Sequence, residues 1–249
     1  MSISKKEVMR RARIYFNTMN TITQKEKTQI ILYCKHTVNL IENLKKDGFI
    51  VNSAIQSKNF KKEFKSISRL QPASGKMLNN FIHLIGMSRV PSLNLLNPVN
   101  NHSASFSGDD ISMIILWSYA TNGELIGRFF KIFVDFTEIV NSLPRPQQGS
   151  IGNTQREKIT FNTIVQILKK KYNTKLFKDV DMDLRNSISH YSFNFFKTRR
   201  NAGIFFYYKK YGSSTSRMKR YNLPRLMITS KKINLVLMAI STTAYPLLR

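Results

Sequence analysis

The sequence predicts a mainly α-helical fold with a small β-hairpin near its C-terminal end. Apolar residues recur at three- and four-residue steps over several long stretches, which is the spacing of one face of a helix. Capping residues and turn-forming residues separate these stretches. Strand-forming residues gather around a Gly-Ser turn only after residue 200.

The first hundred residues are predicted to form an N-terminal helical region. Helical periodicity favours three segments there: residues 3–20, 24–46 and 77–87. Asp47 and Gly48 provide a stop signal after the second segment. Residues 49–70 fit no single element. Residues 88–108 contain Pro91, Pro98 and several Asn and Ser side chains, so we expect loops and turns.

This loop-rich stretch is where a domain boundary would lie. We predict an N-terminal helical region over residues 1–105 and a helical domain over residues 106–249. The alternative is one domain in which residues 88–108 form a long surface loop.

The second half begins with the longest predicted helix, residues 111–143, in which Gly123 introduces a kink or divides the helix in two. Proline and glycine residues predict a flexible connection after it, and a second amphipathic helix follows. The remaining segments are two short strands across a Gly212-Ser213-Ser214 turn and a closing helix. The predicted ranges are 144–153 for the connection, 158–172 for the helix, 204–211 and 217–229 for the strands, and 231–243 for the last helix.

The composition indicates a polyanionic partner. The chain has 249 residues, a formal net charge of +26 and a pI of about 10.3. Such a balance is typical of proteins that bind nucleic acid or an anionic membrane surface, although a solvated basic surface is the alternative. A single cysteine excludes an internal disulfide framework, and the four histidines lack metal-ligand spacing. No leader or membrane span is evident, so we expect a cytoplasmic protein without stable membrane attachment.

The basic residues are concentrated toward the C-terminus. Residues 184–249 contain no Asp or Glu but thirteen Lys and Arg, with tyrosines interleaved. Cations that contact phosphates, next to rings that stack on unpaired bases, favour single-stranded RNA. Phe205 and Phe206 are expected in the core. We predict RNA contacts from eight basic residues and one tyrosine: Lys197, Arg199, Arg200, Lys209, Lys210, Arg217, Lys219, Arg220 and Tyr208.

Residues 179–191 carry the one constellation that suggests chemistry. If they are wound as a helix, at about 100° per residue, an apolar arc and a polar arc separate. The polar arc contains Arg185, Asn186 and His190. The apolar arc is formed by Phe177, Val180, Leu184, Ile188 and Tyr191. Three aspartates precede the polar arc, where the start of a helix favours negative charge and a capping side chain.

Arg185, Asn186 and His190 read as RNxxxH, which resembles the signature of HEPN-domain ribonucleases. The order of predicted elements over residues 109–249 is also similar to that family. The resemblance implies a four- to five-helix bundle, a homodimer whose motif helices face a shared cleft, and cleavage of single-stranded RNA without a metal or other cofactor. Arg185 and His190 would be catalytic, and Asn186 would support them. The residue types suit this chemistry, because imidazole transfers protons near neutral pH and guanidinium binds phosphate.

The resemblance also implies a toxin or a defence effector with an antitoxin or another regulatory protein as partner. One group of the family, which pairs with nucleotidyltransferase antitoxins, has Tyr two residues after the histidine. Ser192 occupies that position here and Tyr191 is adjacent, which argues against that particular partner. Two alternatives stay open: a non-catalytic RNA- or DNA-binding scaffold, and a subunit of a ribonucleoprotein that docks through its N-terminal region.

Overall fold

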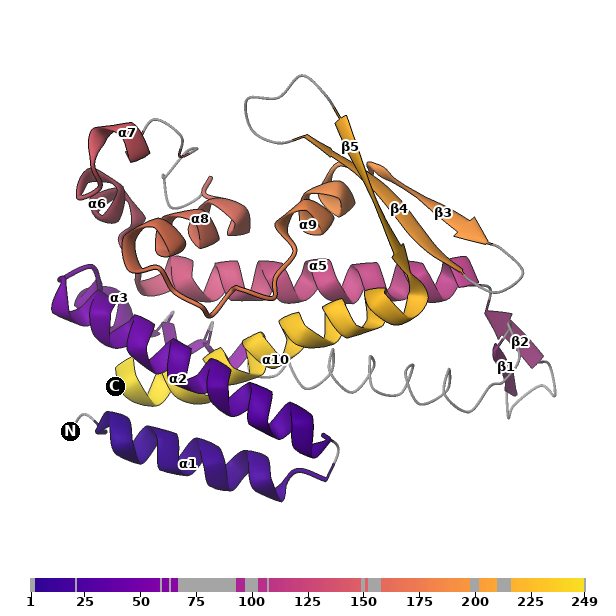
Figure 1. Ribbon diagram of the computed structural model, residues 1–249. Coiled ribbons are helices and arrows are strands. Elements are labelled where there is room, and N and C mark those ends of the chain that lie inside the picture. Colours follow the sequence, from indigo (N-terminus) through magenta and orange to yellow (C-terminus); the bar gives the residue numbers. More distant parts are fainter. Residues whose placement is uncertain are drawn as a thin grey trace. The chain divides into compact units, whose positions relative to one another are not determined.

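The computed structural model describes residues 3–20, 22–58, 60–62, 64–66, 93–96, 103–106, 108–148, 151, 158–197, 202–209 and 216–248 (Figure 1). The chain is mainly helical, as the sequence predicts. The described helices are α1 (Lys5–Thr18), α2 (Gln24–Lys46), α3 (Asn52–Gln56), α5 (Gly108–Phe133), α6 (Phe136–Asn141), α7 (Arg145–Gln148), α8 (Phe161–Tyr172), α9 (Met182–Ser189) and α10 (Leu223–Leu248). The described strands are β1 (Leu93–Leu96), β2 (Ser103–Phe106), β3 (Phe193–Lys197), β4 (Ala202–Lys209) and β5 (Ser216–Asn222).

The chain forms two compact units, each built from segments that are distant in sequence. Unit 1 contains Met1–Gln71, Gly123–Asp179 and Leu235–Arg249, and unit 2 contains Pro72–Asn122 and Val180–Asn234. Helices α5 and α10 therefore each contribute one part to unit 1 and another part to unit 2. The division at residue 105 stays a prediction.

Unit 1 begins with two capped helices that agree with the predicted segments 3–20 and 24–46. The Ser4 side chain accepts a hydrogen bond from the Glu7 N–H and begins α1. Thr23 and Glu26 cap the start of α2 reciprocally, which satisfies two backbone N–H groups that otherwise lack partners. The helix ends where Gly48 adopts a φ of +75°, a conformation that favours glycine. The core of this unit is rich in aromatic rings: Phe60, Phe129, Phe130, Phe133, Phe161 and Phe177 are buried.

The long helix predicted over residues 111–143 is divided, but not at Gly123, where the sequence predicted a kink or division. Helix α5 ends at Phe133 and contains Gly123, and α6 begins at Phe136. Val134 forms an isolated bridge with Ile50. The Asp135 side chain then accepts from the Glu138 N–H at 3.1 Å and begins α6. Local capping thus outweighs the continuous apolar periodicity from which the single helix was predicted.

The connection predicted over residues 144–153 contains one helical turn, α7. The helix predicted over residues 158–172 is confirmed as α8, which begins after the Thr160 cap. The helix predicted over residues 77–87 lies outside the described residues.

Unit 2 contains two antiparallel sheets. In the first, β1 pairs with β2 inside the stretch where we expected only loops and turns. The register pairs Leu93 with Phe106 and Leu96 with Ser103, and Pro91 and Pro98 lie outside the described residues. The loop prediction was therefore wrong for these two short strands.

The second sheet has three strands in the order β3-β4-β5 instead of the predicted two-stranded hairpin. Phe193 pairs with Phe206 at one end of the β3–β4 ladder, and Lys209 pairs with Ser216 at one end of the β4–β5 ladder. The second predicted strand was too long, because α10 starts at Leu223. Its first turn tolerates Pro224, and the Asn222 side chain accepts from the Arg225 N–H at 3.1 Å. The predicted turn at Gly212 lies outside the described residues.

Candidate active site

The motif lies on α9, which is shorter than the predicted helix over residues 179–191. The Asp181 side chain caps the helix by accepting from the Leu184 N–H at 3.0 Å. Phe177 and Val180 are buried as predicted but precede the helix. Leu184 is buried within the helix. The helical projection is therefore valid only for Met182–Ser189.

The C-terminal end of α9 has the geometry of a Schellman motif. The Ser192 N–H donates to the Ser187 carbonyl at 2.8 Å, and the Tyr191 N–H donates to the Ile188 carbonyl at 3.2 Å. Tyr191 occupies the left-handed position with a φ of +51°, where glycine is usual. Its ring is 86% exposed, so its predicted place in the apolar arc is wrong. His190 is the capping residue and its side chain is exposed.

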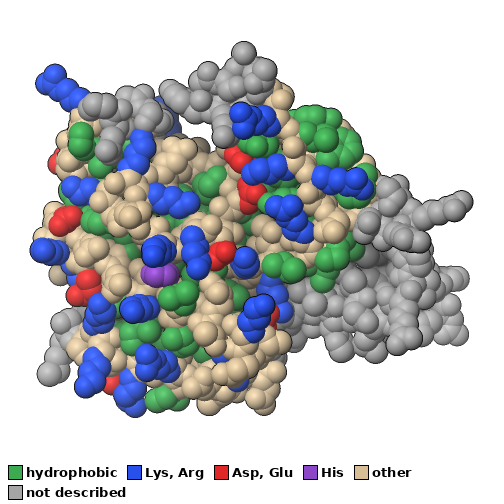
Figure 2. Space-filling model, viewed as in Figure 1, with side chains coloured by type: hydrophobic (Ala, Val, Ile, Leu, Met, Phe, Trp, Pro, Cys, Tyr) green, Lys and Arg blue, Asp and Glu red, His purple; other side chains and the backbone are tan. Residues whose placement is uncertain are grey.

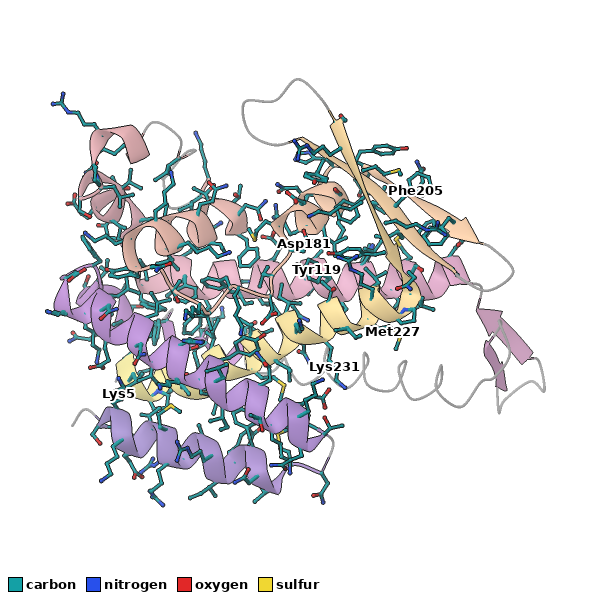
Figure 3. All side chains as sticks on the ribbon, viewed as in Figure 1. Lys5, Tyr119, Asp181, Phe205, Met227 and Lys231 are labelled. Atoms are coloured by element: carbon teal, nitrogen blue, oxygen red, sulfur yellow. The ribbon has the colours of Figure 1, made fainter. Side chains whose placement is uncertain are left out.

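Asp181 also fixes the start of α9 to the rest of unit 2. Its carboxylate accepts from the Tyr221 hydroxyl at 2.5 Å, and its carbonyl accepts from the Tyr119 hydroxyl at 2.8 Å. Figure 3 shows Tyr119 and Asp181 close together. Burial, and then the hydrogen bond to Asp181, raise the pKa of Tyr221 to about 12. Burial likewise raises the pKa of Tyr119.

Lys219 on β5 completes this cluster. Its ammonium lies 2.7 Å from the Asp183 carboxylate and 3.5 Å from that of Asp181. Burial alone would lower the pKa of Lys219, but the two carboxylates outweigh it and the net shift is upward. The same ammonium lies 4.7 Å from the centre of the Tyr208 ring. Lys219 is therefore held as a cation by groups of its own chain.

Helix α9 lies beside the sheet (Figure 1), and two hydrogen bonds join β4 to α9 and to the residues just after it. The buried hydroxyl of Ser187 donates to the carbonyl of Tyr207 at 3.0 Å. The N–H of Tyr207 donates to the carbonyl of Ser192 at 2.9 Å. The end of α9 and strand β4 are thus held at a fixed spacing.

An open pocket of about 330 Å³ lies between them. Its lining residues all carry polar groups and come from α9, the residues after it, β4 and β5: Asp183, Asn186, Ser187, His190, Ser192, Tyr207, Tyr208 and Ser216. Of the three predicted catalytic residues, the structure brings Asn186 and His190 together here. Asn186 lies in the last turn of α9 and His190 caps that turn, with the His190 N–H donating to the Asn186 carbonyl at 3.0 Å.

Arg185 does not line this pocket. It precedes His190 by five positions, and five steps correspond to about 140° around a helix axis. Its side chain is half-buried and its Nε is fully buried. Within one chain the structure therefore places only His190 and Asn186 at this pocket, and the joint action of Arg185 and His190 in a cleft shared by two subunits stays a prediction.

The predicted RNA-binding residues divide between the two faces of the sheet, because side chains alternate along a strand. Tyr208 pairs with Arg217, and Phe206 with Lys219, on one face. Phe205 pairs with Arg220 on the opposite face. Lys197 and Lys209 lie at strand ends, but their side chains are outside the described residues, as are Arg199, Arg200 and Lys210 entirely. The prediction of a buried Phe206 is confirmed, whereas Phe205 is only half-buried.

Sequence reasoning missed Ser187, Ser192 and Tyr207 as site residues. Ser187 lies four residues before Tyr191 and three after Leu184, so its position near the apolar arc was a usable signal for burial. The positions of Ser192 and Tyr207 depend on the register between the end of α9 and β4, which no local pattern indicates.

Comparisons with known proteins identify no family. No protein-family model matches the chain, and neither the curated proteins nor the solved structures contain a match. In the part of the chain that the structure describes, no helix is both long enough and apolar enough to cross a bilayer. Across the same residues, no group of three or more His, Cys, Asp or Glu side chains is placed to hold a metal ion.

Proposed function

We propose that the protein is a metal-independent endoribonuclease that cleaves single-stranded RNA in the pocket at the end of α9. The observation that carries the proposal is the placement of His190 and Asn186 together in an open polar pocket. The strongly basic chain, with no Asp or Glu over residues 184–249, supports RNA as the substrate.

The chemistry requires little beyond proton transfer and charge stabilisation, because RNA supplies its own nucleophile. In the proposed reaction, His190 removes the proton from the ribose 2′-OH. The oxygen then attacks the adjacent phosphorus, the bond from phosphorus to the 5′-oxygen of the next nucleotide breaks, and that oxygen takes a proton from solvent water in the open pocket. The products are a 2′,3′-cyclic phosphate and a 5′-OH. Asn186 donates an amide hydrogen bond to the phosphate.

Arg185 enters the proposal through a second copy of the chain. Since it lies outside the pocket that contains His190, a phosphate there needs another guanidinium to stabilise the transition state. In a homodimer with facing α9 helices, Arg185 of one copy complements His190 of the other. Such a dimer is what the RNxxxH resemblance implies.

Cleavage of labelled single-stranded RNA in EDTA tests the proposal. His190→Ala should reduce the rate about 100-fold or more, the usual value of a general acid or base. Asn186→Ala should reduce it about tenfold, the value of one hydrogen bond. His36→Ala, on α2 in unit 1, is the matched control and should keep full activity. An RNA with a 2′-deoxyribose at the cleaved position should be resistant. Equal rates for His190→Ala and the parent protein would refute the proposal.

Mixing two inactive variants tests the shared site. Arg185→Ala supplies an intact His190, and His190→Ala supplies an intact Arg185, so a mixed dimer contains one complete site. Activity recovered on mixing supports the dimer. If mixed dimers form but activity is not recovered, the shared site is refuted. Either both groups then act within one chain, or Arg185 has no part in the mechanism.

In the cell, the proposal corresponds to a cytoplasmic toxin or defence effector that acts on cellular or invading RNA and is restrained by a regulatory protein. The second candidate is a non-catalytic RNA-binding scaffold, alone or within a ribonucleoprotein. It is favoured by the absence of Arg185 from the His190 pocket. Tight RNA binding without cleavage, for both the parent protein and His190→Ala, would support it.

A further inference from the structure

The sheet face that carries Phe205 is unusually apolar for an accessible surface. Strand alternation and register place Tyr207 opposite Met218, and Phe205 opposite Arg220, on this face. Tyr207 is 42% exposed and Met218 is 61% exposed. The rings of Phe205 and Tyr207 contact edge to face, with centroids 5.9 Å apart. Packed sheets normally bury such residues, so their exposure indicates a binding surface.

The same face carries a cation and no described carboxylate. The Arg220 guanidinium stacks on the Phe196 ring at 3.8 Å from its centroid. Arg220 is nevertheless exposed, so the guanidinium remains accessible on one side. Figure 2 shows hydrophobic side chains next to Lys and Arg side chains over the sheet. Phe205 is labelled at this position in Figure 3.

We propose that this face, formed by Phe196, Phe205, Tyr207, Met218 and Arg220, binds unpaired RNA bases by stacking while Arg220 contacts the phosphate between them. Exposed rings next to a cation are what single-stranded nucleic acid requires, because every base has a π face and every linkage a negative charge. Phosphodiester charge also matches this acid-free part of the chain. This inference rests on the proposed function in taking RNA as the ligand.

Tyr207 connects this face to the site. It lies on the stacking face by its register with Met218, and it also lines the pocket that contains His190. An RNA strand bound to this face would therefore place one stacked base on the residue whose backbone is hydrogen-bonded to Ser187 and Ser192 at the pocket. Stacking on this face would select unpaired RNA for the site.

Binding to a noncleavable 2′-O-methyl oligonucleotide tests this inference independently of catalysis. Fluorescence anisotropy with the full chain should show at least a tenfold weaker affinity for Tyr207→Leu, which keeps an apolar side chain but removes the ring. Tyr207→Phe should stay within about twofold of the parent protein, since stacking is retained. An abasic oligonucleotide of equal length and charge should bind at least tenfold more weakly than the normal one.

Arg220 and Arg217 both lie on β5 and carry the same charge, but they lie on opposite faces of the sheet. Arg217→Ala is therefore the charge-matched control for Arg220→Ala. Arg220→Ala should weaken binding more than Arg217→Ala, although both variants lose one positive charge. Equal affinities for normal and abasic oligonucleotides, or equal effects of the two arginine variants, would overturn the inference. Analytical sedimentation of Tyr207→Leu measures whether this variant still forms the oligomer that the parent protein forms. If its weaker RNA binding is accompanied by dissociation of a dimer, the face is an interface between copies and the inference fails.

The two proposals fail separately. Cleavage without base-dependent binding leaves the ribonuclease and removes the stacking face. Base-dependent binding without cleavage leaves the stacking face and removes the ribonuclease.

Discussion

Replacing Asp181 tests how the candidate site is held in place. Its side chain begins α9 by accepting from the Leu184 N–H, and it accepts a second hydrogen bond from the buried Tyr221 hydroxyl. Lys219 is a third, longer contact at 3.5 Å. Asp181→Ala removes all three interactions at once. Asp181→Asn keeps a good capping residue and a carbonyl oxygen that can accept from Tyr221.

The magnitude follows from these contacts. Loss of the cap costs about 1 kcal/mol. Loss of a charged hydrogen-bond acceptor for a buried hydroxyl costs about 1.5–3 kcal/mol. The Lys219 contact adds little, because that side chain is one-third exposed. Asp181→Ala should therefore lower the free energy of unfolding by about 3 kcal/mol, and Asp181→Asn by about 1 kcal/mol or less.

Urea unfolding followed by circular dichroism measures both variants, and Tyr221→Phe completes a double-mutant cycle with Asp181→Ala. The cycle should give a coupling of at least about 1 kcal/mol, because each single change removes the same hydrogen bond. If Asp181→Ala and Asp181→Asn are equally stable, or if the coupling is zero, then Asp181 does not anchor α9 in the way that its contacts indicate.

Two further predictions concern Tyr191, which follows α9, and Tyr221, the hydrogen-bond partner of Asp181. Tyr191→Gly should raise the free energy of unfolding by about 1 kcal/mol, because the left-handed conformation is strained for tyrosine and the exposed ring loses no packing. Tyr191→Ala keeps the strain, so an equal gain in urea midpoint for both variants would contradict this explanation. The pKa of Tyr221 is about 12 when folded, against an ordinary value of 10.0, so the folded state holds this proton more tightly. Its contribution to stability is complete below pH 10 and is lost as the pH rises toward 12. When the free energy of unfolding is measured across this range, it should decline less steeply with pH for Tyr221→Phe than for the parent protein. An unchanged slope would count against the Asp181–Tyr221 contact.

The sequence alone was sufficient to predict those helices in which the apolar spacing and the capping residues indicate the same boundaries. In α2, apolar spacing, the Thr23–Glu26 capping pair and the Gly48 stop all indicate the same helix. In the residues around 134, periodicity and capping disagree, and capping with the Ile50 bridge decides the outcome. Continuous apolar spacing alone therefore overestimates helix length.

The end of α9 could not be predicted, because it depends on a tyrosine in a conformation that glycine usually occupies. Strand β3 was missed for a different reason. Its sequence, FNFFK, places apolar residues on both faces, so it lacks the alternation by which strands are recognised. The division of the basic cluster between two faces depends on the β4–β5 register, which was predicted only as a hairpin.

The separation of Arg185 from His190 decides how the site can work. The helical projection placed both in one polar arc, but five steps along a helix correspond to about 140°, and only His190 lines the pocket. The hydrogen bonds of Ser187 and Tyr207 hold the end of α9 against β4. The ammonium of Lys219 is already paired with Asp181 and Asp183. The proposed reaction therefore requires a further cation at the phosphate, and the proposed homodimer assigns that role to Arg185 of the second copy.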